Sequence, residues 1–180
     1  MKIALIIIGI LIVLFICIYG YYGGFTKIEF KPQKQDKETI VYESVTGDYS
    51  QTSKYTDKIY FALLNEDKVE TTRGIGIFYD NPQTTDKDKL RSDVGCVLDN
   101  PDSITIARLS EKYQLQALPA GDFIVTEFPM NGSLSFLLGI IKVYPALNRY
   151  CIKHGYKDSP IMEIYDVPNK KIIYRKGIVK

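Results

Sequence analysis

Residues 73–82 read RGIGIFYDNP, and residues 161–168 read IMEIYDVP. Both stretches are rich in β-branched and aromatic residues, and each ends in Tyr-Asp-x-Pro, so each predicts a strand that stops before a proline. The shared ending, at Tyr79 and at Tyr165, indicates that the chain contains two copies of one structural unit. The alternative is a chance match, because the motif is short.

The elements expected around these two strands follow the same order in both halves of the chain. Residue periodicity and turn residues predict a strand, a helix and two further strands in each half. The predicted elements are, in chain order, 39–45, 50–64, 73–79 and 91–98, then 123–128, 133–153, 161–166 and 171–175. A short helix over 104–113 is expected between the halves, and Pro145 is expected to interrupt the longest helix.

The predicted fold class is therefore α+β. Two β-α-β-β units are expected to pair edge to edge into one antiparallel sheet that carries its helices on one face. We expect a cleft between the halves, on the other face of this sheet.

The N-terminal segment has a different character. From Ile3 to Phe25 no residue is charged, and this length is enough to cross the hydrocarbon core of a bilayer. Apolar residues such as Phe15 fill most of it, and Tyr19 begins a tyrosine cluster of the kind found at the headgroup level. The chain is thus expected to divide into a transmembrane anchor over 1–25, a stalk or first strand over 26–38 and a domain over 39–180.

Two further points concern this segment. A cleaved signal peptide is the alternative, but it would have a shorter apolar core followed by a small-x-small site. The basic residues that follow the segment outnumber Lys2, which precedes it; they are Lys27, Lys31, Lys34 and Lys37. The positive-inside rule therefore predicts a single-pass protein with a cytosolic domain and a lumenal or exterior N-terminus.

Charge and residue usage argue against several functions. There are 23 basic and 21 acidic residues, giving a net charge of +2, and no basic stripe that would indicate nucleic-acid binding. Three cysteines without a CxxC motif and a single histidine argue against a zinc site, and no cofactor is predicted. The sequence also offers no nucleophile paired with a base, so we do not expect an enzyme.

Four residues are candidates for a ligand site. Glu163 and Tyr165 share one face of their strand, and a carboxylate in an aromatic pocket would attract a cation. Glu127 alternates with apolar neighbours and is expected in the same cleft. Tyr79 and Tyr165 could provide stacking surfaces there. The alternatives are a structural glutamate that orders a turn and tyrosines that belong to the core.

Short motifs in this order resemble those of the GyrI-like family, the effector-binding domain of certain bacterial transcription regulators. They are Thr46-Gly47-Asp48-Tyr49, Tyr79-Asp80-Asn81-Pro82 and Glu163-Ile164-Tyr165. Leu90-Arg91, Val94-Gly95 and Phe128-Pro129 add a resemblance to a eukaryotic, membrane-anchored branch of that family, that of a testis-expressed ER-phagy receptor. The resemblance implies that Glu163 lies in a cleft for cationic or polar ligands, and it favours the ER membrane, with a mitochondrial membrane as the alternative.

Together these features predict a non-enzymatic binding or scaffold domain on the cytosolic face of a membrane. Its expected partners are the lipid bilayer, other proteins and a small cationic or polar ligand, but no nucleic acid. An accessory subunit of a larger, organellar membrane complex is the first alternative, and a small-molecule hydrolase is the second.

Overall fold

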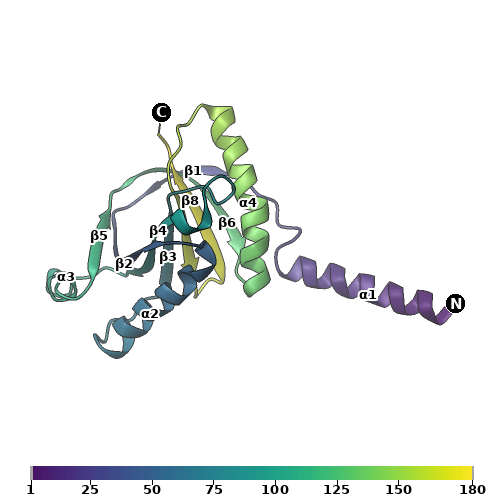
Figure 1. The fold of residues 1–180 in the computed structure, drawn as a ribbon, viewed down its shortest axis with the longest axis horizontal. Coiled ribbons are helices and arrows are strands. Elements are labelled where there is room, and N and C mark those ends of the chain that lie inside the picture. The colour runs from purple at the N-terminus through teal and green to yellow at the C-terminus, as the bar shows by residue number, and fades with distance from the viewer. Residues whose placement is uncertain (1, 180) are drawn as a thin grey trace.

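The computed structural model describes residues 2–179, so the predicted limits at Met1 and Lys180 lie outside the described residues. The predicted α+β class is confirmed, with an eight-stranded antiparallel sheet (Figure 1). The helices are α1 (Lys2–Tyr21), α2 (Thr52–Asn65), α3 (Ser103–Ser110) and α4 (Ser133–His154), with 3-10 turns at Tyr49–Gln51 and Lys87–Lys89. The strands are β1 (Lys31–Gln35), β2 (Glu38–Thr46), β3 (Arg73–Phe78), β4 (Arg91–Leu98), β5 (Gln114–Leu118), β6 (Gly121–Pro129), β7 (Ile161–Asp166) and β8 (Lys171–Gly177).

The strand order confirms the duplicated unit. The sheet runs β1-β6-β8-β7-β3-β4-β2-β5, so β2-α2-β3-β4 and β6-α4-β7-β8 form two matching halves. The halves meet where β3 pairs with β7, with Gly76 opposite Glu163. The centre of the sheet is therefore made by the two strands that end in Tyr-Asp-x-Pro.

The edge strands are exchanged between the halves. β1 precedes β2 in the chain but pairs with β6, whereas β5 precedes β6 but pairs with β2. The sequence did not predict β5, and it left 26–38 as either a stalk or a strand. Because each half completes the sheet of the other, neither edge strand can pair without the opposite half.

Helices α2, α3 and α4 pack on one face of the sheet, as predicted. Ile59 and Leu63 of α2 are buried together with Val41 of β2, and Leu109 of α3 joins the same cluster. α4 buries every fourth residue, and Val143 packs with core residues of β6 and β8. This spacing is that of a helix with one apolar stripe turned to the sheet.

The predicted interruption of α4 is not observed. The helix is continuous across Pro145, which removes a single backbone donor but lies between the buried residues Val143 and Leu147. Packing on both sides of the proline holds the helical turn together. The helix ends at Gly155, which adopts a left-handed conformation with φ 68°.

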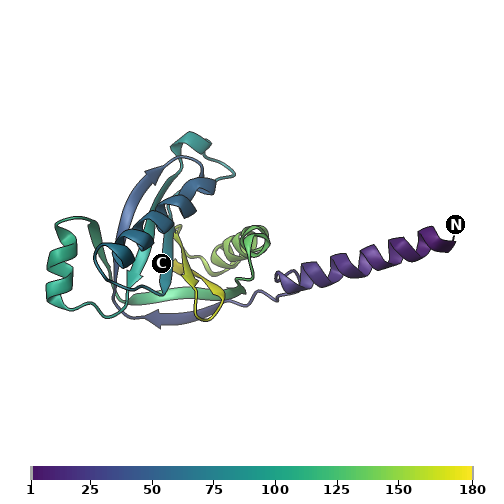
Figure 2. The ribbon, with the colours of Figure 1, turned by 90° about the horizontal axis from the view of Figure 1, so that it is seen from below.

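The other face of the sheet is concave and filled, because the sheet curls around its own core (Figure 2). Ile40, Ile75, Val97 and Ile164 pack there and are fully buried. The prediction of a cleft on this face is therefore wrong. Buried side chains from five strands pack together in this interior.

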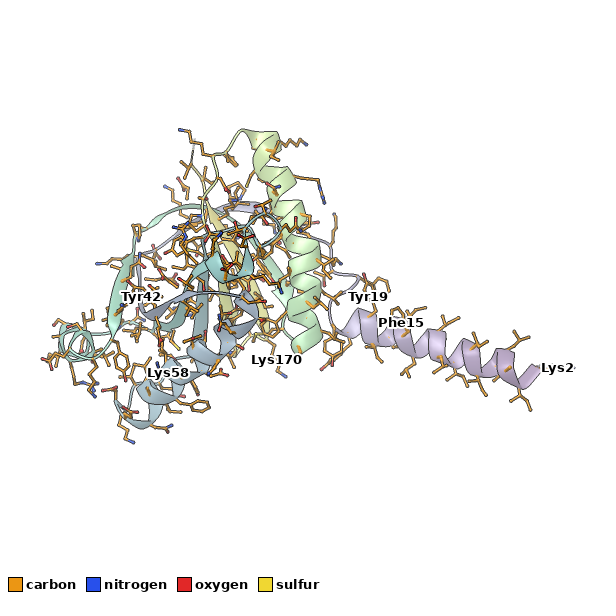
Figure 3. The ribbon with its side chains drawn as sticks, viewed as in Figure 1. Lys2, Phe15, Tyr19, Tyr42, Lys58 and Lys170 are labelled. Atoms are coloured by element: carbon orange, nitrogen blue, oxygen red, sulfur yellow. The ribbon has the colours of Figure 1, made fainter. Side chains whose placement is uncertain are left out.

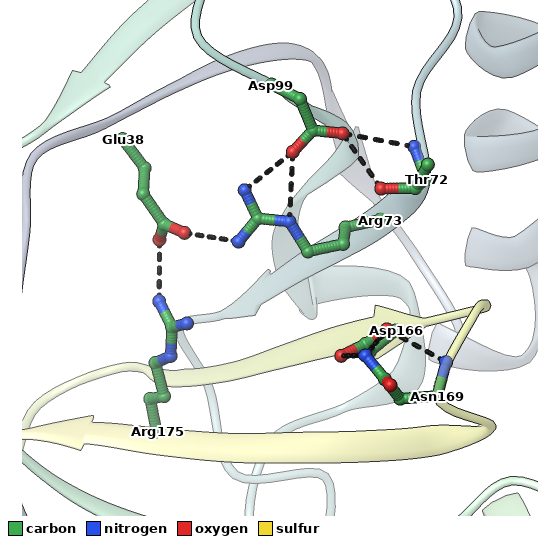
Figure 4. A network of polar contacts seen from close by, with 7 residues as sticks. All are labelled: Glu38, Thr72, Arg73, Asp99, Asp166, Asn169 and Arg175. Atoms are coloured by element: carbon green, nitrogen blue, oxygen red, sulfur yellow. Dashed lines mark hydrogen bonds and ion pairs between the residues drawn. The ribbon is translucent and has the colours of Figure 1, made fainter.

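A network of charges fixes the curl (Figure 4). Glu38 of β2 accepts hydrogen bonds of 2.6 Å from Arg73 of β3 and from Arg175 of β8. Asp99 accepts a further bond of 2.9 Å from Arg73. β2 and β8 are separated in the sheet by three strands, so Glu38 can reach Arg175 only because the sheet is curled.

Helix α1 extends away from the domain and none of its residues is buried (Figures 1 and 2). An 18-residue window of α1 has a mean hydropathy of 3.1, so the helix is long and apolar enough to cross a membrane. Phe15 and Tyr19 stack on one another near its end (Figure 3).

Candidate functional site

A cavity of about 1160 Å³ lies on the helix-bearing face, between α2 and α4 and above β3, β4 and β7. This volume accommodates a drug-sized ligand, since such pockets commonly enclose ~300–1,000 Å³. Much of the lining is aromatic, from Tyr49, Tyr60, Phe61, Phe78, Phe136, Tyr144 and Tyr165. The sequence predicted a cleft between the halves, and the structure places it on the face opposite to the one expected.

Glycines of β3 keep the floor of this cavity open. Gly74 lines the cavity, and a Cβ atom there would lie 3.2 Å from the Tyr165 ring and 3.3 Å from Thr56. At Gly76 an added Cβ would lie 2.7 Å from the ring of Phe78. Within the RGIGIF stretch, Ile75 and Ile77 therefore point into the concave core, whereas Phe78 lines the cavity.

Glu163 lies at the floor of the cavity, on β7, and is only 4% exposed. Its carboxylate accepts hydrogen bonds from the hydroxyls of Tyr144, at 2.6 Å, and Tyr165, at 2.8 Å. Burial raises the pKa of Glu163, and the two hydroxyl bonds act in the opposite direction. No lysine or arginine among residues 2–179 forms an ion pair with this carboxylate. The site is thus a buried acid that lacks a cation.

The tyrosines around Glu163 are hydrogen-bond donors. Burial raises the pKa values of Tyr144 and Tyr165 well above the ordinary range, so both hydroxyls remain protonated. The hydroxyl of Tyr174, on the neighbouring strand, is buried and has no partner in the described part of the chain. Gly139 lets α4 pass directly over this hydroxyl, which an added Cβ would strike.

The charges around the cavity favour a cationic occupant. The two basic residues of the lining are already paired. Lys87 forms an ion pair with Asp48, at 2.8 Å, and Arg73 forms ion pairs with Glu38 and Asp99. The acids that remain without an ion pair in the described chain are Asp57, Glu70 and Glu163. The lining therefore carries a negative excess.

The two tyrosines of the repeated motif are not equivalent. Tyr165 lines the cavity, whereas Tyr79 lies on the concave side and donates a hydrogen bond of 2.6 Å to Asp93. The structure therefore does not bring Tyr79 into the candidate site. Side chains alternate between the two faces of a strand. Two residues that match in sequence therefore point to opposite faces when one of them is displaced by one position in the sheet.

Glu127 also lies outside the cavity, contrary to its expected place. Its neighbours Thr126 and Phe128 are buried beneath the helices, and Glu127 points to the opposite face of β6. There it pairs with Lys171, at 2.7 Å. The alternation that suggested a shared face was correct, but that face is not the one that carries α4.

Tyr144, which donates to Glu163 from the helix above it, was not among the residues predicted from the sequence. Phe136, Ile140 and Tyr144 all line the cavity and are spaced four residues apart on α4. This spacing is the signal that could have identified them, since residues i, i+4 and i+8 share a helix face.

Solved structures of low sequence identity share this fold. The C-terminal domain of EcmrR matches with a TM-score of 0.60 and 10% identity, covering 85% of this chain and 98% of that one. The structure of SAV2435 bound to tetraphenylphosphonium matches with a TM-score of 0.52 and 16% identity, covering 84% of this chain and 94% of that one.

Curated relatives are found in mammals. Testis-expressed protein 264 of Homo sapiens is 29% identical over 134 residues, and its Mus musculus homolog is 28% identical over the same length. These matches cover 71% of this chain but only 41% of each relative, so the chain spans about two-fifths of their length. The family described as the GyrI-like small molecule binding domain matches residues 29–173, and this chain therefore belongs to that family.

Proposed function

We propose that this protein is a membrane-anchored, non-enzymatic binding module for a small aromatic or apolar cation. The observation that carries the proposal is the carboxylate of Glu163, which is buried at the floor of an aromatic cavity without a cationic partner among residues 2–179. A buried charge is costly unless it is paired, and a bound cation would supply the missing charge. The rings around it would add cation–π attraction.

The polar groups at the floor support binding rather than catalysis. They are one carboxylate and tyrosine hydroxyls that serve as its donors. The lining also contains Cys96, but burial raises the pKa of its thiol to about 11, so little thiolate is available as a nucleophile. Acyl transfer or hydrolysis would require an activated nucleophile and a base in contact.

Binding can be tested with tetraphenylphosphonium, the ligand in the SAV2435 structure. Isothermal titration of the detergent-solubilised full chain is expected to show saturable binding. Glu163→Gln should weaken it by about tenfold or more, equivalent to ~1.4 kcal/mol. Glu127→Gln is the matched control and should leave binding unchanged, because Glu127 lies on the opposite face. Equal affinities of the two variants would contradict the proposal.

The proposal places the domain on the cytosolic side of the ER membrane, anchored by α1. The apolar α1, none of whose residues is buried, and the lysines that follow it support this orientation. Protease added to sealed microsomes should then remove the domain. Survival of a C-terminal tag on intact vesicles would show the reverse orientation.

A scaffold role toward other proteins belongs to the same proposal. Native sizing after mild detergent extraction separates it from the accessory-subunit alternative. Migration as a free monomer or dimer supports a binding module, whereas co-migration with a stoichiometric set of membrane proteins would make the chain a subunit.

A further inference from the structure

The C-terminal end of α1 is held against the domain by hydrogen bonds from α4. Lys142 of α4 donates hydrogen bonds to the carbonyl oxygens of Gly23, at 3.4 Å, Gly24, and Thr26, at 2.9 Å. Carbonyl groups at and beyond a helix C-terminus lack helical partners and carry partial negative charge. The ammonium group of Lys142 thus satisfies the backbone where the anchor ends.

Further contacts come from the beginning of α4. Asn131 donates to the carbonyl oxygen of Tyr21, at 2.7 Å, and Ser135 donates to that of Tyr22, at 3.2 Å. Gly23 has φ 94°, and a Cβ atom there would lie 2.6 Å from Pro129 and 2.8 Å from Phe128. Side-chain bonds and close packing therefore fix the direction of α1 relative to α4.

The outward surface of α4 beside this junction is apolar. Leu134, Leu137 and Ile141 are 45%, 52% and 59% exposed. Their spacing places them on one stripe, and this stripe lies opposite the residues that α4 buries against the sheet, such as Ser135 and Val143. Three large side chains are thus presented to the surroundings where the anchor leaves the domain.

The arrangement of the two helices indicates what covers this stripe. α4 lies crosswise to α1 and between α1 and the rest of the domain (Figure 1). A helix crosswise to a membrane-spanning helix runs along the membrane surface, where interfacial helices bury an apolar face ~5–10 Å into the headgroup–acyl boundary. Lys170, at the end where α4 begins (Figure 3), suits anionic headgroups.

We infer that Leu134, Leu137 and Ile141 lie in the interface of the bilayer that α1 spans, so that the domain rests on the membrane along α4. This inference rests on the proposed anchor. Because Phe136, Ile140 and Tyr144 of the same helix line the cavity, one wall of the ligand site then stands at the lipid surface. A lipophilic cation concentrated in that layer would reach the site from the membrane.

The test measures depth in the bilayer. Full-length Cys17→Ser protein receives one further cysteine, Leu137→Cys or Ile141→Cys, and an environment-sensitive fluorophore; Cys96 and Cys151 are buried. Ile104→Cys is the matched control, since Ile104 is exposed on α3, which lies far from α1 (Figure 1). Each protein is reconstituted in phosphatidylcholine–phosphatidylserine vesicles containing brominated lipid.

Strong quenching at Leu137→Cys and Ile141→Cys, with little at Ile104→Cys, is the expected result. Quenching at these two positions no greater than at Ile104→Cys would overturn the inference. A label on the native Cys17 then separates the two proposals. If that label is quenched, the anchor stands and only the contact of α4 fails; if it is not, the anchor fails as well.

Discussion

The hydroxyl of Tyr144 donates a hydrogen bond of 2.6 Å to the carboxylate of Glu163, and this contact joins α4 to β7 across the floor of the cavity. One residue comes from the long helix of the second half and the other from the central strand pair. The contact therefore links the wall that would meet a ligand to the group that would bind it.

Replacing Tyr144 by phenylalanine removes one of two donors to a buried carboxylate. We expect Tyr144→Phe to lower the free energy of unfolding by about 1.5–3 kcal/mol, as is usual for hydrogen bonds to charged groups. Chemical denaturation of the detergent-solubilised chain measures this loss. Tyr79→Phe is the control, because Tyr79 donates to the more accessible Asp93, and its loss should be smaller. Comparable losses in the two variants would mean that the hydrogen bond to Glu163 stabilises the fold no more than the bond to Asp93 does.

The raised pKa of Glu163 predicts how ligand binding depends on pH. Its folded-state pKa lies above the ordinary value of 4.5, so the folded chain holds a proton that the unfolded chain would release. Glu163 therefore favours the folded state less as the pH rises through that pKa. Cation binding needs the ionised form and should weaken as the pH falls through the same pKa. Titrations at several pH values should show this slope in the native chain and none in Glu163→Gln.

The charge network on the concave face predicts a large loss of stability from a single change. Glu38→Gln leaves the nearly buried guanidinium of Arg175 without its anion, and breaking a buried pair costs about 3–5 kcal/mol. Lys58, labelled in Figure 3, forms an exposed pair with Glu43, and Lys58→Met should cost at most about 1 kcal/mol. The midpoints of urea denaturation compare the two, and similar midpoints would show that the network does not hold the curl.

The local features of this fold could be predicted from the sequence. Strands such as β7 end shortly before a proline, and α2 and α4 have the spacing of helices with one buried stripe. The exchange of β1 and β5 between the halves could not be predicted, because it depends on pairing between residues far apart in the chain. The strand β5 is short and lacks β-branched residues, so its sequence gives little signal by itself.

The residues of the candidate site could likewise be predicted only in part from the sequence. Alternation along a strand tells which residues share a face, but not which face carries the helices. This is why Glu163 and Tyr165 were correctly grouped, while Glu127 and Tyr79 were expected in a cavity that lies on the other side of the sheet. The four-residue spacing of Phe136, Ile140 and Tyr144 shows that they share a helix face, but whether that face meets the site depends on how α4 packs on the sheet.

The junction of anchor and domain gives a last prediction, which concerns motion. Lys142→Gln removes the ammonium group that bonds the carbonyl groups past the end of α1, so the direction of α1 should become less fixed. Spin labels at Cys17 and Ile104→Cys, measured in micelles by pulsed electron resonance, should give a broader distance distribution in this variant. Lys153→Gln is the control, because Lys153 is exposed near the far end of α4. An unchanged distribution in Lys142→Gln would mean that Asn131, Ser135 and the packing of Gly23 suffice to orient the anchor.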